Sequence, residues 1–347
     1  MAPLVRSIVS LLSLDVALSY FEPDQQEFLG TFDASINGDS GYTLARKYVG
    51  QDFFDGFDFK TFEDPSHGRV NNEDTELTSA PSSYVSRQQA HERGLAYIDE
   101  GNTFVMKVDD QHTVAPGHRG RDSIRIESQE DFGNGVIILD VRHIPTGCAT
   151  WPAFWTLGAG NWPNGGEIDI LEGVNGVGTN QATLHTSSGC TMPNHINATG
   201  TQLDTNCAIA TNEDHGCGVR DNRQESFGAA FNRENGGWLA MQRANEGIQM
   251  WYWPRYSHVP EDVKNGEQKV NPSNWGKPFA AFPSTHCDIA NHFDQHKIIF
   301  STTLCGDWAG ATYSQSGCPG TCQSHVDGYP GAFKYAYWKI NGLRVYH

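Results

Sequence analysis

Residues 166–173 read Gly-Glu-Ile-Asp-Ile-Leu-Glu-Gly, and apolar residues separate the three carboxylates Glu167, Asp169 and Glu172. This alternation predicts a β-strand with one charged face. In a regular strand Glu167 and Asp169 share a face with Leu171, whereas Glu172 points the opposite way. One extra residue, a β-bulge between Asp169 and Glu172, would return Glu172 to the acidic face and bend the strand. We therefore expect a bulged strand that lines one concave surface with three carboxylates.

The spacing of these carboxylates suits a pair of catalytic carboxyl groups. If the bulge takes up one of the five residue steps, the other four, of about 3.3 Å each, separate the α-carbons of Glu167 and Glu172 by roughly 13 Å, and side chains that lean inward over a bend shorten that gap. A separation of about 5 to 5.5 Å is typical of retaining glycosidases. Asp169 lies between them, and repulsion between like charges raises the pKa of one carboxyl so that it stays protonated. The alternative is an acidic strand edge that faces solvent or binds Ca²⁺.

Three tryptophans precede this strand in the sequence. Trp151, Trp155 and Trp162 all lie within sixteen residues of Glu167, in the motifs Trp-Pro-Ala-Phe-Trp and Asn-Trp-Pro-Asn-Gly-Gly. Sugar rings stack their C–H faces on indole rings, so tryptophans beside a carboxylate cluster indicate a carbohydrate site. The alternative is that these tryptophans belong to the hydrophobic core.

Together, residues 151–155, 161–175 and 180–186 resemble glycoside hydrolase family 16, and within it the fungal endo-1,3(4)-β-glucanases called laminarinases. The similarity extends from Tyr42 to Tyr346, and the Glu-Ile-Asp-Ile-Leu-Glu motif is highly specific for the family. Scarce helical periodicity and many alternating runs already predict an all-β sandwich of two antiparallel sheets. The resemblance implies a β-jelly roll whose concave sheet forms an open substrate cleft, which suits internal cleavage of a polymer.

The resemblance also implies roles for the three carboxylates. Glu167 is expected to be the nucleophile and Glu172 the acid/base of a retaining mechanism. Asp169 is expected to hydrogen-bond Glu167 and to modulate the charge of the pair. The expected activity is hydrolysis of β-1,3 and mixed-linkage β-1,3/1,4 glucans such as laminarin.

Three further residues match positions of the family: Arg125 a cleft arginine, His185 a substrate-contacting histidine and Trp308 a substrate-stacking tryptophan. The alternative interpretation of Arg125 is an arginine on the surface of a strand, and that of His185 is a histidine with a structural role. The candidates for holding the glucan are Trp155, Trp162, His185, Arg125 and Trp308.

Two other functions remain open. A cell-wall β-glucan transglycosylase shares the chemistry but passes the glycosyl group to another sugar, so longer oligosaccharides would appear. A non-catalytic β-glucan-binding lectin could share the sandwich, but the intact Glu167, Asp169 and Glu172 argue against it.

Composition limits the partners and the number of domains. The chain has 347 residues, 37 glycines and a net charge of −17. We expect one catalytic domain over residues 20–347, and a monomer. The negative charge disfavours nucleic acid and leaves a neutral polysaccharide as the expected partner. No organic cofactor and no metal are expected; some relatives hold a structural Ca²⁺, but no clustered aspartate loop here indicates one.

Export is expected from the N-terminus and from the cysteines. Residues 1–19 resemble a secretory signal peptide, and no later stretch is apolar enough to span a bilayer. Eight cysteines in an exported chain predict four disulfides, with 105 possible pairings. Asn197 begins the one clean glycosylation sequon. A secreted protein, extracellular or in the cell wall, is the expectation.

Two segments carry conflicting signals. Residues 72–83 are acidic and rich in serine where related sequences continue almost directly, so we expect a disordered loop or a retained intron. Asn341-Gly342 has the chemistry of a hairpin turn, whereas the family implies one nearly continuous closing strand, which we favour. Residues 237–243 and 247–254 predict an antiparallel pair, and residues 182–186 a neighbour of the acidic strand.

Overall fold

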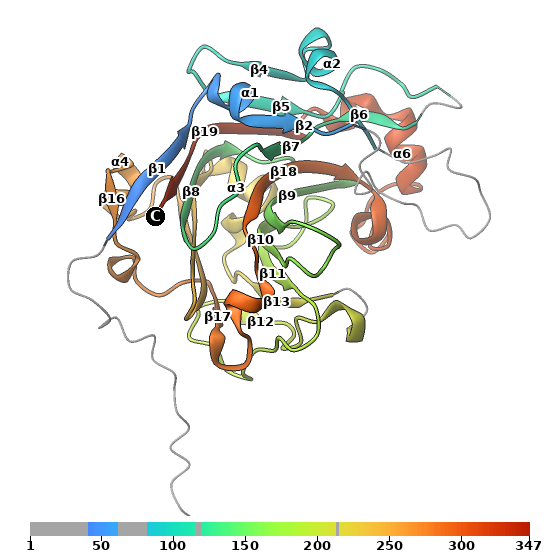
Figure 1. Ribbon diagram of the computed structural model, residues 1–347. Helices are drawn as coiled ribbons and strands as arrows, with labels where there is room; N and C mark the ends of the chain where they lie inside the picture. Colours follow the sequence, from blue (N-terminus) through green and yellow to red (C-terminus); the bar gives the residue numbers. More distant parts are fainter. Residues whose placement is uncertain (1–40, 62–81, 116–118, 213–214) are drawn as a thin grey trace, which may run out of the picture. The chain divides into compact units, whose positions relative to one another are not determined.

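The computed structural model describes residues 41–61, 82–115, 119–212 and 215–347. The expected signal peptide and residues 72–81 of the expected insertion lie outside the described residues. Figure 1 shows the strands of two large antiparallel sheets. No helix in the described ranges has the length and apolar character needed to cross a membrane.

The first sheet has nine strands, and the C-terminal strand lies in its interior. Its main order is β16-β1-β19-β8-β14-β15-β17, and β5, which pairs with β4, is added to β19. These strands are β16 (Lys269–Val270), β1 (Tyr42–Tyr48), β19 (Tyr337–Tyr346), β8 (Gly135–His143), β14 (Gly237–Ala244), β15 (Gly247–Pro254), β17 (Ala280–Pro283), β5 (Phe104–Lys107) and β4 (Ala96–Ile98).

The second sheet has eight strands and contains the acidic strand. Its order is β12-β13-β11-β10-β9-β18-β7-β2. These strands are β12 (Thr201–Gln202), β13 (Cys217–Arg220), β11 (Gln181–His185), β10 (Glu167–Glu172), β9 (Thr150–Gly158), β18 (His296–Leu304), β7 (Arg125–Ser128) and β2 (Phe57–Phe59). A separate parallel pair joins β3 (Ser82–Tyr84) to β6 (Arg121–Ser123).

Helices are short and lie in the connections. The α-helices are α1 (Asp52–Gly56), α2 (Arg87–Glu92), α3 (Gly228–Arg233), α4 (Glu261–Asn265), α5 (Ile289–His292) and α6 (Cys322–Gly328). The remaining helical turns are η1 (Ile209–Thr211), η2 (Gln224–Ser226), η3 (Pro272–Asn274), η4 (Ser284–His286), η5 (Gly306–Gly310) and η6 (Pro330–Phe333).

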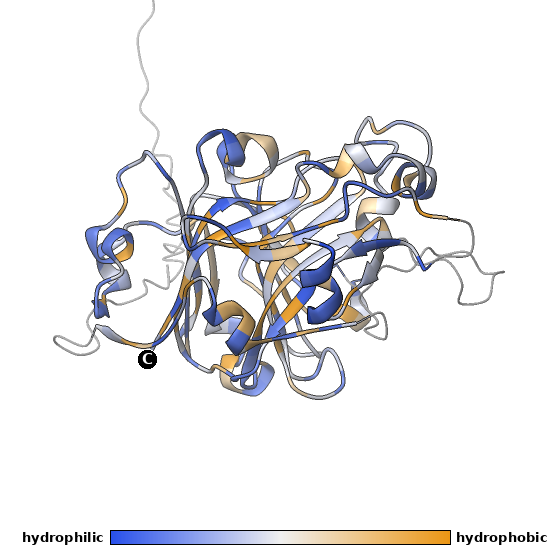
Figure 2. Cartoon of the chain, turned by 90° about the horizontal axis from the view of Figure 1, so that it is seen from above, coloured by the Kyte–Doolittle hydropathy of each residue, from blue (hydrophilic) through white to orange (hydrophobic). Residues whose placement is uncertain are grey.

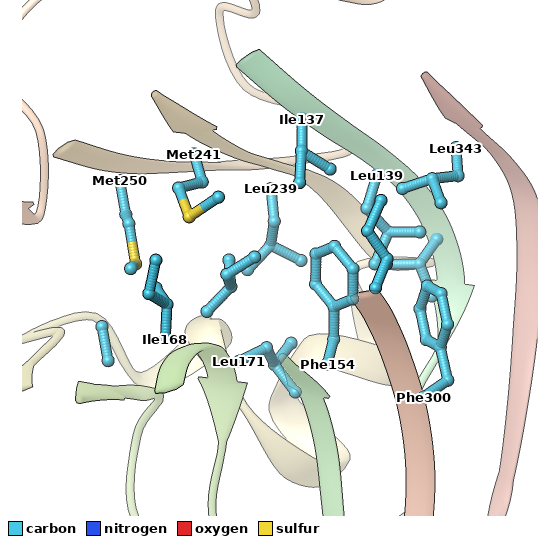
Figure 3. Packing of buried hydrophobic residues seen from close by; sticks show 14 of the residues in the cluster. Ile137, Leu139, Phe154, Ile168, Leu171, Leu239, Met241, Met250, Phe300 and Leu343 are labelled. Atoms are coloured by element: carbon cyan, nitrogen blue, oxygen red, sulfur yellow. The ribbon is translucent and has the colours of Figure 1, made fainter. Parts of the chain in front are cut away.

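The main core lies between the two large sheets. Figure 3 shows side chains from β9, β10 and β18 facing side chains from β8, β14, β15 and β19: Phe154, Ile168, Leu171 and Phe300 against Ile137, Leu139, Leu239, Met241, Met250 and Leu343. All of these side chains are buried. Figure 2 shows hydrophobic colour along many of the strands and hydrophilic colour on much of the helices and loops. The predicted sandwich of two antiparallel sheets is confirmed.

Several local predictions can be compared with the strands. The antiparallel pair β14–β15 is confirmed from Gly237↔Pro254 to Ala244↔Gly247. β19 runs through Asn341-Gly342 without a hairpin, so the family-based expectation was right and the turn chemistry misleading. Its pairing with β8 shifts register there, and the Asn341 amide donates to Asp140 Oδ1 at 2.9 Å, which accommodates the turn-prone dipeptide inside a strand.

Two boundaries differ from the sequence prediction. Ser82 and Ser83 were assigned to the disordered insertion, but they begin β3, because pairing with Arg121 and Asp122 of β6 gives their main chain partners. Residues 123–127 alternate polar with apolar side chains, a pattern that predicts one strand, yet the run divides at Ile124 between β6 and β7, which belong to different sheets.

All eight cysteines form disulfides, as expected. The pairs are Cys148–Cys318, Cys190–Cys287, Cys207–Cys217 and Cys305–Cys322. Cys305–Cys322 joins the end of β18 to α6, and so encloses η5, which carries Trp308.

Candidate active site

The acidic strand contains the expected bulge. Along β9 the partners of β10 run Asp169↔Trp155 and then Leu171↔Phe154, so Ile170 is the extra residue. Along β11 they run Asp169↔Thr183 and then Glu172↔Gln181. Leu171 therefore joins Ile168 and Ile170 in the core instead of sharing the acidic face. The bulge brings Glu172 to the same face as Glu167 and Asp169.

A tryptophan holds the first carboxylate. The Trp162 Nε1–H donates to Glu167 Oε2 at 2.6 Å, while the Trp162 side chain remains 46% exposed. Its ring also lies 6.3 Å from the His185 ring, centroid to centroid. Trp162 thus combines an anchored N–H with a ring face open to solvent, which suits contact with a sugar.

His185 and Asp169 form a buried contact beside Glu167. His185 is the register partner of Glu167 on β11, and its Nε2 lies 3.2 Å from Asp169 Oδ2. Asp169 is only 2% exposed and shares a hydrogen bond with Glu167. The three residues therefore form one connected group on the site face.

A second tryptophan, Trp151, holds Glu172, although only Trp155, Trp162 and Trp308 were tryptophan candidates for holding the glucan. Trp151 Nε1–H donates to Glu172 Oε1 at 2.7 Å. The Trp308 ring packs edge-on against the Trp151 ring, with centroids 6.0 Å apart and an interplanar angle of 85°. Trp308 thus reaches the carboxylates through Trp151. Strand alternation, which puts Trp151 on the same face as Trp155, was the available signal.

Arg125 on β7 and Trp155 on β9 form a covered pair across the intervening strand β18. The Arg125 guanidinium lies 4.8 Å from the centre of the Trp155 ring, and its Nη2 donates to Glu127 Oε1 at 2.6 Å. Trp155 Nε1 donates to Ser301 Oγ at 3.3 Å. Arg125 and Trp155 are 4% and 9% exposed, so Arg125 covers a ring face that stacking on a sugar would need. Glu127, not foreseen from the sequence, fixes the arginine.

Burial raises the pKa of all three carboxyl groups of this cluster. It raises the pKa of Glu167 to about 7, with a further rise from the Asp169 charge, while His185, the Trp162 hydrogen bond and Arg125 act in the opposite direction. Burial also raises the pKa of Asp169, against its hydrogen bond with Glu167. For Glu172, burial and then the Asp169 charge raise the pKa well above its usual range. Glu172 is therefore suited to hold a proton at neutral pH.

The same group has the donor set of a metal site. Ligand atoms of Glu167, Asp169 and His185 all lie within 4.8 Å of one another. Trp162 already donates to Glu167, and Glu167 and Asp169 share a hydrogen bond. The expectation that no metal takes part stays a prediction.

Asp169→Asn is expected to stabilise the protein at neutral pH and not in acid. The unfolded carboxyl ionises near pH 4 and the folded one near pH 7, so stability falls as the pH rises through this window. The variant should gain on the order of 1–3 kcal/mol over the wild type at pH 8, and the gain should vanish at pH 4. Urea unfolding at both pH values measures it, with exposed Asp58→Asn as control. A gain independent of pH would contradict this electrostatic explanation.

The predicted sequon is accessible. Asn197 is exposed in the connection between β11 and β12. Its glycosylation stays a prediction.

The sandwich presents three carboxylates on one face of β10, and two of them accept hydrogen bonds from indole N–H groups. This combination is typical of a carbohydrate-active domain. Comparison with known proteins agrees. The chain belongs to glycoside hydrolase family 16, because the XgeA-like catalytic GH16 domain matches residues 57–346.

Relatives span both related sequences and solved structures. A probable glycosidase of Schizosaccharomyces pombe is 44% identical over 88% of this chain and 69% of its own length. A probable endo-1,3(4)-β-glucanase of Aspergillus fumigatus is 37% identical over 88% of this chain, which spans 45% of that protein. The chain thus spans less than half of this longer relative.

Two solved structures are similar throughout. Laminarinase 16A of Phanerochaete chrysosporium is 41% identical with a TM-score of 0.83, covering 89% of this chain and 100% of its own. An elongating GH family 16 β-1,3-glucosyltransferase is 37% identical with a TM-score of 0.80, covering 88% of this chain and 100% of its own.

Proposed function

We propose that this domain is an endo-acting, retaining β-glucanase that hydrolyses β-1,3 and mixed-linkage β-1,3/1,4 glucans. One observation carries the proposal: the bulge in β10 turns Glu167 and Glu172 to one face, and each receives an indole N–H. The laminarinase 16A structure, which holds 6-O-glucosyl-laminaritriose in donor and acceptor sites, supports this substrate class.

In the proposed first step, protonated Glu172 gives its proton to the glycosidic oxygen while Glu167 attacks the anomeric carbon. The bond to the leaving sugar breaks and a glycosyl ester on Glu167 forms. The raised pKa of Glu172 supports its role as the acid.

In the second step, ionised Glu172 takes a proton from water, and the resulting nucleophile releases the sugar from Glu167. Two displacements retain the anomeric configuration. Asp169 modulates the charge of Glu167 through their hydrogen bond.

Substrate contact is proposed for Trp162, His185 and Trp308, with Arg125 and Trp155 as a supporting pair. The exposed ring of Trp162 offers a stacking surface beside Glu167. Trp308 lies on the Glu172 side, through Trp151. Sugars bound at Trp162 and Trp308 would then approach the two carboxyl groups from different sides.

A second candidate is transfer of the glycosyl group to another sugar. The similarity to the elongating glucosyltransferase favours it specifically, because the first chemical step is shared. The acceptor, water or sugar, decides between hydrolysis and transfer.

Incubation with laminarin, lichenan and cellulose, followed by sizing of the products, tests the proposal. We expect short oligosaccharides from laminarin and lichenan, produced by internal cuts, and none from cellulose. Products longer than the starting oligosaccharide would indicate transfer. No reducing sugar from any β-glucan would overturn catalysis and favour a binding protein.

Export is part of the proposal. Four disulfides are typical of oxidising compartments, and Asn197 is exposed. A secreted monomer acting on extracellular or cell-wall glucan fits these features.

A further inference from the structure

Two main-chain groups of the bulge bond to one side chain instead of a neighbouring strand. Asn180 Oδ1 accepts from the Glu172 N–H at 2.9 Å, and Asn180 Nδ2 donates to the Ile170 carbonyl at 3.0 Å. On this side of β10 the register partner changes from Thr183 to Gln181 while β10 advances from Asp169 to Glu172. The Asn180 amide thus supplies the donor and acceptor that a strand partner would offer.

Asn180 itself is fixed in place. It is fully buried, its N–H donates to Ser226 Oγ at 2.9 Å, and its carbonyl accepts from the Asp221 N–H at 2.8 Å. The Ser226 hydroxyl in turn donates to the Arg223 carbonyl at 2.7 Å. Every polar group of Asn180 has a partner, so its amide has one orientation.

We propose that Asn180 is a positioning residue whose side-chain amide holds the β10 bulge in the geometry that presents the Glu172 carboxyl to the substrate. The inference rests on the proposed acid/base role of Glu172. The Ile170 carbonyl and the Glu172 N–H flank Leu171, so bridging them fixes both peptide planes around Leu171. Leu171 then enters the core and Glu172 the site face.

The alternative strand geometry explains why this bridge matters for catalysis. A regular strand would turn Glu172 toward the core side, with Ile168 and Ile170. Without the amide the bulge relaxes, and Glu172 moves relative to both Trp151 and the glycosidic oxygen. A displacement of roughly 1 Å can cost on the order of 100-fold in rate.

The chain contains a matched control for the loss of such a bridge. Asn232 spans the main chain of Ile144 in the same manner, accepting from its N–H at 2.9 Å and donating to its carbonyl at 3.0 Å. Asn232 lies in α3 and Ile144 follows β8, so neither residue belongs to the acidic strand or to a strand paired with it. Asn232→Ala removes two hydrogen bonds of the same kind, from a side-chain amide to the main chain, and leaves the hydrogen bonds of β10 unchanged.

The experiment compares Asn180→Ala with Asn232→Ala on laminarin and on an aryl β-glucoside whose leaving group needs no protonation. For Asn180→Ala we expect kcat on laminarin to fall about 10- to 100-fold with KM changed less than about threefold. The loss in glycosylation rate on the aryl substrate should be smaller, and the alkaline limb of the pH profile should shift. Asn232→Ala should keep the wild-type kcat and pH profile.

Ser226→Ala, which removes the acceptor of the Asn180 N–H, should produce a weaker change of the same kind and serves if Asn180→Ala does not fold. An unchanged kcat in folded Asn180→Ala, or equal losses in both asparagine variants, would overturn the inference. An inert wild type would instead contradict the proposed function. Carboxyl ¹³C NMR would then still test the inference, since the Glu172 titration should shift in Asn180→Ala only.

Discussion

Glu167→Ala is expected to lower kcat on laminarin by on the order of 10⁴-fold or more while leaving the fold intact. The variant keeps the acid but lacks the group that bonds to the anomeric carbon, so no glycosyl ester can form. Removing a half-buried carboxyl with a raised pKa also removes an electrostatic cost to the folded state. Release of reducing sugar measures the activity, and thermal unfolding measures the fold.

Glu246→Ala is the matched control, because Glu246 is exposed at the turn between β14 and β15. It should keep full activity. Substantial hydrolysis by a folded Glu167→Ala protein would refute the assignment of the nucleophile. A variant that fails to fold would be replaced by Glu167→Gln, which keeps the shape and the acceptor for Trp162.

Glu172→Ala is expected to have two different effects, depending on the leaving group. On laminarin, whose leaving oxygen needs a proton, kcat should fall by about 10² to 10⁴-fold, the usual range for a general acid. On an activated aryl β-glucoside the first step should remain fast. The glycosyl ester on Glu167 should then accumulate, because no base activates water for the second step.

Stopped-flow release of the aryl group shows this as a burst followed by a slow steady state, and mass spectrometry detects the ester. Equal losses on both substrates, without a burst, would show that Glu172 does not act as the acid. The Trp151→Phe variant, which removes the hydrogen bond to Glu172, serves as a milder comparison.

The sequence was most informative at the acidic strand. Alternation alone placed Glu172 on the wrong face, and the need for a bulge followed from requiring all three carboxylates to meet. The structure has that bulge with Ile170 as the extra residue. The local sequence pattern could predict this bulge, because the face on which a strand side chain lies depends only on its position along the strand.

Contacts between distant segments could not be predicted in this way. Asn180, which ties the bulge, appeared in the sequence only as part of a family motif, and its role depends on a bonding geometry that spacing does not show. Arg125 and Trp155 were both expected to contact sugar, which stays a prediction; that the guanidinium lies over the indole ring, because β7 and β9 both flank β18, was not foreseen. The division between β6 and β7 likewise depends on which sheet each half joins.

The site also illustrates a conflict between stability and function. Three carboxyls with raised pKa values stand next to one another, and each is less costly when protonated than when charged. The indole N–H groups of Trp151 and Trp162 offset part of that cost and fix the two glutamates. The same arrangement suits two glutamates to different proposed roles, Glu172 as the acid and Glu167 as the nucleophile.

In the proposed mechanism, one bulged strand supplies carboxyls to opposite faces of the same anomeric carbon. Azide rescue of the two alanine variants on an aryl β-glucoside, with the glycosyl azides identified by NMR, tests it most directly. We expect the α-azide from Glu167→Ala, where azide replaces the nucleophile, and the β-azide from Glu172→Ala, where azide attacks the ester. The same anomer from both variants, or the reverse assignment, would contradict it.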